Sequence, residues 1–181
     1  MNHAQLPFDE DDHVSEDAKR KASALIQRAQ IPIGDYGRRI SCHELRELVE
    51  IRIREAQALA SVGLPCGAYY LAGYAVELAL KVRIAESVGR CEFPNASLAH
   101  AAYRHDLKKL LHVAGLFEEY MQAERTIEGF SERWETVLRW SETSRYNESV
   151  SLSDAICLIE AISNPSSGAI SWIRQYWRVG A

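Results

Sequence analysis

Apolar residues recur at three- and four-residue spacing along the chain from Ala22 onward, and no segment shows a sustained alternation of apolar and polar residues. The first pattern is typical of amphipathic helices, whereas a half-buried strand requires the second. Apolar residues make up 47% of the 181 positions and charged residues 25%, a balance that allows a sizeable core. The sequence therefore predicts an all-α protein with one main core.

The expected helices follow one another with short breaks, as in an up-and-down bundle. They cover residues 41–62, 66–87, 105–113, 116–126, 130–140 and 151–162, with a last helical segment around Trp172. Ser41 and Glu44 have the spacing of a capping box, and Ser151 or Ser153 is expected to cap a later helix. Residues 66–87 are the most apolar segment and should form the central helix. A polar corner at residues 141–149 interrupts the helices.

The chain is expected to have three parts, and the first of them stands out by its charge. Residues 1–17 carry six acidic side chains and no Lys or Arg, so the net charge of −4 leaves +2 for the remainder. We expect an acidic leader over residues 1–17, which is a solvated tail, contacts a basic partner or covers a basic site in place of RNA. An accessory helix and linker are expected over residues 18–40, and the helical bundle over residues 41–181.

Several classes of protein are not expected from this sequence. The N-terminus lacks the basic and apolar regions of a secretory signal, and the uncharged stretch Ser61–Val76 is interrupted by glycines and a proline. We therefore expect a cytoplasmic protein without a transmembrane segment. The four cysteines form no CxxC pair, the histidines lack the spacing of a metal site, and no glycine-rich phosphate loop occurs. Neither a metal nor a cofactor is expected.

Two charged residues, Glu77 and Lys81, lie four positions apart on the otherwise apolar central helix, with Tyr74 on the same stripe. Glu four positions before Lys is the favourable order for an ion pair within a helix. Isolated charges are costly to bury, so these side chains either pair with each other or line a cleft or a dimer interface.

A second group of polar residues surrounds His105. Asp106 is expected to cap a helix whose leucines face inward, while His105 and His112 fall on or near a basic face with Lys108 and Lys109. A histidine beside an aspartate is a candidate general base. A helix start held by Asp106 and His105 explains the same residues.

The polar corner contains Arg145, Tyr146 and Asn147 in succession. An arginine offers a planar donor fork for a phosphate, and a neighbouring aromatic ring offers a face for a base. In the alternative interpretation Arg145 caps carbonyls of the preceding helix and Tyr146 packs in the core.

Three blocks, taken in order, resemble the HEPN (higher eukaryotes and prokaryotes nucleotide-binding) domain family. The blocks are AYYLAGYAVELALK at residues 68–81, HDLKKLL at residues 105–111, and Trp140 followed by SRYN at residues 144–147. The resemblance covers roughly residues 42–178. It implies an up-and-down four-helix bundle of HEPN type, here with an extra N-terminal helix and a short additional helix. It also implies a homodimer whose polar faces frame one cleft.

The resemblance further implies a nucleotide- or RNA-binding protein of a toxin–antitoxin or defence-type system. Members that cleave RNA without a metal carry an Arg followed after four to six residues by a His. Here the corresponding positions after Arg145 hold Val150, Ser151 and Leu152. Arg38 and His43 have the spacing but precede the first bundle helix, so we interpret them as a chance match.

Three hypotheses follow from these residues. In the first, Arg145 binds the phosphate of a nucleotide or RNA, Tyr146 and Asn147 support the base or ribose, and Glu77 and Lys81, with Tyr74, shape the cleft. In the second, the protein is a metal-independent endoribonuclease toxin that uses Arg145 with His105 or His112. In the third, it is a non-catalytic partner of a nucleotidyltransferase-like antitoxin.

Overall fold

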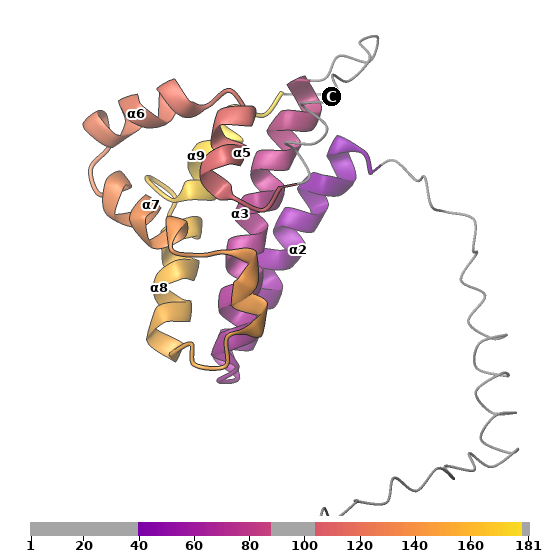
Figure 1. Cartoon of the computed structure of the whole chain (residues 1–181), viewed down its shortest axis with the longest axis vertical. Coiled ribbons are helices and arrows are strands. Elements are labelled where there is room, and N and C mark those ends of the chain that lie inside the picture. Colours follow the sequence, from indigo (N-terminus) through magenta and orange to yellow (C-terminus); the bar gives the residue numbers. More distant parts are fainter. Residues whose placement is uncertain (1–39, 88–103, 179–181) are drawn as a thin grey trace, which may run out of the picture. The chain divides into compact units, whose positions relative to one another are not determined.

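The computed structural model describes residues 40–87 and 104–178, and all regular structure in these ranges is helical (Figure 1). Residues from Ile40 onward form one compact unit. The acidic leader and, apart from Ile40, the accessory helix and linker expected over residues 18–40 lie outside the described residues. The elements are α2 (Cys42–Ser61), α3 (Pro65–Ser87), α5 (Leu107–Val113), α6 (Phe117–Thr126), α7 (Phe130–Leu138), the 3-10 helix η1 (Glu142–Tyr146), α8 (Leu152–Ser163) and α9 (Ala169–Arg174).

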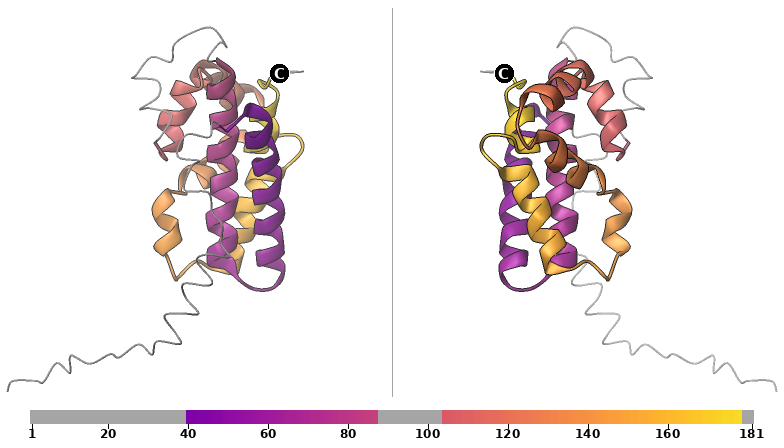
Figure 2. Two further views of the ribbon diagram at one scale, coloured as in Figure 1. Left: turned by 90° about the vertical axis from the view of Figure 1, so that its right-hand side faces the viewer. Right: turned by 90° about the vertical axis from the view of Figure 1, so that its left-hand side faces the viewer.

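Helices α2 and α3 form an antiparallel pair (Figures 1 and 2). The expected capping box begins α2: the backbone N–H of Glu44 donates to Ser41 Oγ at 3.2 Å, and that of Ser41 donates to Glu44 Oε2 at 2.9 Å. The connection turns at Gly63, whose φ of 74° lies in the left-handed region that glycine adopts without strain. Pro65 then begins α3, where its fixed φ suits the first helical position.

Helix α3 is the central helix, as its apolar composition predicts. It contacts α2, α5, α8, α9 and η1, and twelve of its 23 residues are buried. One of the twelve is Glu77. No helix in the described ranges is both long and apolar enough to cross a membrane.

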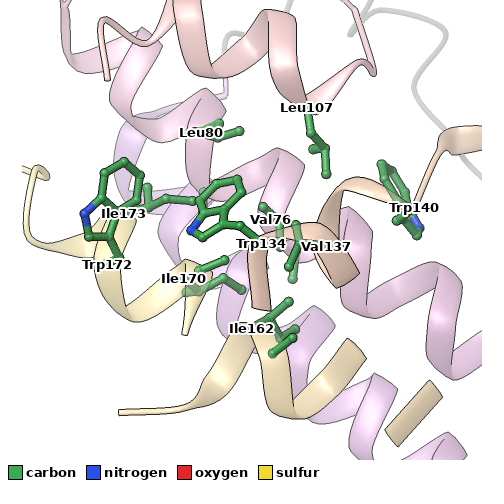
Figure 3. Packing of buried hydrophobic residues seen from close by; sticks show 14 of the residues in the cluster. Val76, Leu80, Leu107, Trp134, Val137, Trp140, Ile162, Ile170, Trp172 and Ile173 are labelled. Atoms are coloured by element: carbon green, nitrogen blue, oxygen red, sulfur yellow. The ribbon is translucent and has the colours of Figure 1, made fainter. Parts of the chain in front are cut away.

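Aromatic side chains from the later helices form a large part of the core (Figure 3). Trp134 of α7 meets Trp172 of α9 edge to face, with ring centroids 5.6 Å apart. Tyr120 of α6 packs edge to face against the same two rings. Such offset and edge-to-face contacts stabilise beyond the area that they bury. They join the short helices α6, α7 and α9 to one another.

A close backbone contact helps to hold the polar corner against α3. A Cβ atom built at Gly73 would lie only 2.2 Å from Cγ of Trp140, so the indole packs directly on the backbone of α3. Trp140 immediately precedes Ser141, the N-cap of η1. Glycine at position 73 thereby allows the corner to approach the middle of α3.

Helix boundaries agree with the sequence to within about two residues at most ends. Asp106 caps α5 as expected, since its side chain accepts from the backbone N–H of Lys109 at 3.1 Å. Ser151, rather than Ser153, caps α8 and shares a capping box with Asp154. The polar corner interrupts the α-helices as expected, and within it residues 142–146 form a 3-10 helix. Cys157 is exposed, and Cys42 and Cys66 are partly buried; all three are free thiols.

Candidate functional site

The buried carboxylate of Glu77 lies at the centre of a polar cluster. Its side chain is 1% exposed, and its Oε1 accepts a hydrogen bond from Lys81 Nζ at 2.7 Å. Nδ1 of His105 lies 3.0 Å from both carboxylate oxygens. The carboxylate is therefore paired, as burial of a charge requires. The pairing expected from the spacing of Glu77 and Lys81 is present, and His105 is a further partner.

His105 joins three elements of the fold. It precedes Asp106, the N-cap of α5, and its Nε2 lies 3.1 Å from Oε2 of Glu142 in η1. Both ring nitrogens thus face carboxylates, and only the doubly protonated ring can donate to both. The imidazole links α3 to η1 while its side chain stays 44% exposed.

A pocket of about 700 Å³ opens beside His105, and we call it the His105 pocket. It contains two cationic side chains, Arg104 and Lys108, which are exposed and have no carboxylate partner among the described residues. Of its carboxylates, Glu142 faces His105 and Asp106 faces Lys109. The residues that line the pocket are Arg104, His105, Asp106, Leu107, Lys108, Leu138, Trp140, Ser141, Glu142 and Thr143.

Arg145 and Tyr146 form an exposed stacked pair at the end of η1. The Arg145 guanidinium carbon lies 4.9 Å from the centroid of the Tyr146 ring. Tyr146 is 74% exposed, which excludes the interpretation in which it packs in the core. In residues 40–87 and 104–178, no carbonyl or carboxylate is bonded to the Arg145 side chain. Its donors and the face of the tyrosine ring are available to a ligand.

Asn147 belongs to a second pocket, which shares Ser141 and Thr143 with the first. This pocket has a volume of about 450 Å³, and we call it the Arg139 pocket after its cationic side chain. Asn147 Oδ1 accepts from the backbone N–H of Ser149 at 2.9 Å, so its amide NH₂ group remains a free donor. The pocket is lined by Tyr69, Thr136, Arg139, Ser141, Thr143, Ser144, Asn147, Ser149, Val150, Asp154 and Cys157.

The lining of the Arg139 pocket is mainly a set of hydrogen-bond donors. Burial raises the pKa of Tyr69, Asp154 adds to the rise, and Arg139 opposes it, so the phenol remains protonated at neutral pH. Asp154 is already engaged, because its carboxylate accepts from Ser151 Oγ at 2.6 Å. Arg139 has no ion-pair partner in the described part of the chain. The pocket therefore suits a ligand rich in oxygen acceptors.

Three of the predicted site residues, Tyr74, Lys81 and His112, line neither the His105 pocket nor the Arg139 pocket. Tyr74 is half-buried and stacks on Tyr70 at 6.1 Å, and burial together with Glu77 and Tyr70 raises its pKa against the opposing effect of Arg52. Neither Tyr74 nor the Glu77–Lys81 pair lines the His105 pocket or the Arg139 pocket. His112 stacks on Phe117, with centroids 3.9 Å apart. The cluster thus brings together Glu77, Lys81 and His105, with Glu142 as the fourth member.

A further pocket of about 620 Å³ lies between α7 and α8. Its walls carry the carboxylates of Glu132 and Glu160, and its one cation, Arg133, donates to the carbonyl of Gly129 at 2.7 Å. This balance of charge is unfavourable for an anion. We therefore place the candidate site at the two pockets that flank η1.

The sequence interpretation missed two residues of this site. Glu142 contacts His105 across 37 positions of sequence, which no local pattern indicates. Arg139 is the C-cap of α7 and lies six positions before Arg145. The presence of an arginine at each end of the polar corner is the sequence signal that could have identified it. No group of three or more His, Cys, Asp or Glu side chains in the described ranges could hold a metal ion.

Comparison of the chain with models of protein families, with curated proteins and with solved structures found no match.

Proposed function

We propose that this chain is a HEPN-type helical protein that binds a nucleotide or RNA at the surface formed by Arg145, Tyr146 and the His105 pocket. The four-helix arrangement, the homodimer and a place in a toxin–antitoxin or defence-type system belong to the same proposal, since they rest on the resemblance of the three sequence blocks. The observation that carries it is the stacked pair of Arg145 and Tyr146, both exposed to solvent.

The chemistry of this pair fits a phosphate joined to a base. A guanidinium presents several N–H donors in a planar fork that matches phosphate oxygens, and an exposed phenol ring is a stacking surface for a base. Since Arg145 contacts no carboxylate in the described residues, its charge is not already neutralised. Tyr146 also holds the guanidinium in one place through the cation–π contact.

The His105 pocket adds two cationic side chains, in walls that also hold the paired carboxylates of Asp106 and Glu142. Arg104 and Lys108 lie in its walls without carboxylate partners among the described residues, and η1 carries both Glu142 of the pocket and Arg145. We infer that Glu77 and Lys81 act from behind the pocket. They hold the imidazole of His105 in place rather than contacting the ligand themselves.

The orientation of His105 also favours a second candidate, a metal-independent endoribonuclease. In that reaction the ribose 2′-OH attacks the adjacent phosphorus, the P–O bond to the 5′-oxygen breaks, and a cyclic phosphate and a free 5′-OH are formed. His105 would transfer protons at these oxygens, and Arg145 would stabilise the charge on the phosphate. The Glu77 contact at Nδ1 holds the His105 ring beside the pocket, and Nε2 would exchange Glu142 for the reacting oxygens to transfer these protons.

Binding and cleavage are tested together with a labelled single-stranded RNA in EDTA. The variants are Arg145→Ala and, as a matched control, Arg125→Ala, an exposed arginine in the last turn of α6 outside both pockets. We expect Arg145→Ala to weaken binding about tenfold or more and to lower the salt dependence of log K by about 0.7. Arg125→Ala should bind as the wild type does.

The outcomes separate the two candidates. Binding without cleavage, lost in Arg145→Ala, supports the binding protein. EDTA-resistant cleavage that is lost in both Arg145→Ala and His105→Ala supports the ribonuclease. Unchanged binding in Arg145→Ala, in a variant that melts as the wild type does, would overturn the proposal.

A further inference from the structure

The two pockets that flank η1 are adjacent parts of one surface. Ser141 and Thr143 line both of them, so the His105 pocket and the Arg139 pocket meet along the start of the 3-10 helix. Arg145 and Tyr146 follow at the other end of the same helix. Each pocket has a volume within the range of about 300–1,000 Å³ that is usual for sites of small ligands. A mononucleotide would occupy only one of them.

Each pocket also has at least one cation without an ion-pair partner among the described residues. Arg104 and Lys108 serve the His105 pocket, and Arg139 serves the Arg139 pocket; none of the three has a carboxylate partner among the described residues. A free cation in each of two adjoining pockets matches two successive phosphates of one chain. One phosphate would contact the cation of only one of the two pockets.

The Arg139 pocket further carries groups that suit a ribose. Hydroxyl-bearing side chains predominate in its lining, and the free NH₂ group of Asn147 adds a donor. Ser141 Oγ and Thr143 Oγ1 lie 2.6 Å apart at the boundary of the two pockets. A 2′-hydroxyl is both a donor and an acceptor, so hydroxyl and amide partners can distinguish a ribose from a deoxyribose.

We propose that this surface binds single-stranded RNA across both pockets rather than a free nucleotide, with the Arg139 pocket as a second subsite and Arg139 as its phosphate contact. This inference rests on the proposed function, since it extends the Arg145 surface by one nucleotide unit or more. Stacking on Tyr146 makes an unpaired strand the fitting form of RNA, because a base in a duplex has no free face.

The test compares uridine 5′-monophosphate, single-stranded octauridylate and the matching deoxyribose octamer as probes of the full-length protein. Fluorescence anisotropy of the labelled octamers and competition by the mononucleotide give the affinities. The variants are Arg139→Gln in the second subsite and Arg145→Gln on the shared surface. Arg125→Gln is the control. The Arg139 side chain is exposed and its backbone N–H bonds to Thr136, so Arg139→Gln should fold normally, which thermal melting checks.

We expect octauridylate to bind at least about tenfold more tightly than the mononucleotide and more tightly than the deoxyribose octamer. Arg139→Gln should weaken octauridylate about fivefold or more and leave the mononucleotide within about twofold. Arg145→Gln should weaken both ribose probes.

Contrary results fall into distinguishable classes. If Arg139→Gln leaves octauridylate unchanged while Arg145→Gln weakens it, the second subsite is wrong and the proposed function stands. Equal affinity for the two octamers would overturn the ribose assignment. If the wild type binds none of the probes, the proposed function itself fails, and the inference fails with it. Tyr69→Phe, which removes one hydroxyl of the Arg139 pocket, should also weaken the binding of octauridylate. If neither Tyr69→Phe nor Arg139→Gln changes this affinity, the second subsite is rejected.

Discussion

The carboxylate of Glu77, in the middle of α3, accepts a hydrogen bond of 3.0 Å from Nδ1 of His105, which lies 28 residues further along the chain. The other ring nitrogen of His105 faces Glu142 of η1. The start of α5, the central helix and the polar corner are thereby joined at one imidazole, next to the pocket that we propose as part of a binding surface.

The stability of this junction depends on the charge of Glu77. Glu77→Gln keeps the shape of the side chain but removes the charged acceptor of Lys81 and His105. We expect the free energy of unfolding to fall by about 1–3 kcal/mol, measured by urea denaturation at pH 7. The control is Glu47→Gln, whose exposed carboxylate pairs, among the described residues, only with the exposed His43, and which should change stability by less than about 0.5 kcal/mol. Equal effects of the two variants would show that the cluster is not a structural junction.

The close contact of Gly73 with Trp140 predicts an unusual response to alanine. Alanine favours a helix over glycine by about 1 kcal/mol, yet a Cβ atom at position 73 would lie 2.2 Å from the indole. We expect Gly73→Ala to lower the free energy of unfolding by about 1–3 kcal/mol and to displace the polar corner. Gly67→Ala on the same helix meets only the end of Leu59 at 3.0 Å, and its effect should stay below about 1 kcal/mol. A stabilised Gly73→Ala protein would contradict the close packing of Trp140 on α3.

The cap of α5 gives a prediction with a pH dependence. Burial raises the pKa of the Asp106 carboxyl, but hydrogen bonds from the backbone and side chain of Lys109 outweigh it and hold the pKa below the ordinary value of 3.8. A lowered pKa in the folded state stabilises the protein above about pH 4, and this contribution is lost as the pH falls through the folded-state value.

Asp106→Ala should therefore destabilise the protein by about 1 kcal/mol at pH 7, and the difference from wild type should shrink below about pH 3.5. Denaturation curves at both pH values measure this. Asp106→Asn keeps a capping acceptor but loses the charge. At pH 7 its stability should therefore lie between that of the wild type and that of Asp106→Ala. If the difference in stability between wild type and Asp106→Ala grows in acid, the pKa of Asp106 is not lowered in the folded state.

Substitutions of Tyr146 are expected to change the affinity for RNA without changing the stability of the fold. Because 74% of the residue is exposed, Tyr146→Ala should change the free energy of unfolding by less than about 0.5 kcal/mol. Loss of one stacking platform should weaken binding of octauridylate by about 1–3 kcal/mol, or roughly 5- to 150-fold. Tyr146→Phe keeps the ring and should bind within about threefold of wild type. A large loss of stability in Tyr146→Ala, with affinity preserved, would assign this residue to the fold.

The sequence predicts the helices well because their signals are local. The capping box of Ser41 and Glu44 spans three positions, and the cap of α5 depends on Asp106 and the next turn alone. The corner was expected to break the helices. It forms a 3-10 helix, and the contact that packs Trp140 on Gly73 joins residues from distant parts of the chain, which no local pattern indicates.

The candidate site is predicted less completely, since its geometry depends on packing. The spacing of Glu77 and Lys81 predicts their ion pair, but nothing local indicates that His105 completes it. The sequence leaves two environments open for Tyr146, and only the arrangement of η1 on α3 shows that the ring is exposed. Pockets such as the His105 pocket arise where separate elements meet, so neither their walls nor the role of Arg139 is visible in periodicity.

The most direct test of the central claim is an NMR titration of the full-length protein with single-stranded octauridylate, followed by backbone amide shifts. We predict saturable shifts confined to residues 104–109 and 139–150, with smaller changes in the facing part of α3. Amides of α6, whose residues line neither the His105 pocket nor the Arg139 pocket, should stay unchanged. Shifts centred on α6 or on the pocket between α7 and α8, or an absence of shifts at millimolar RNA, would contradict a binding surface at Arg145.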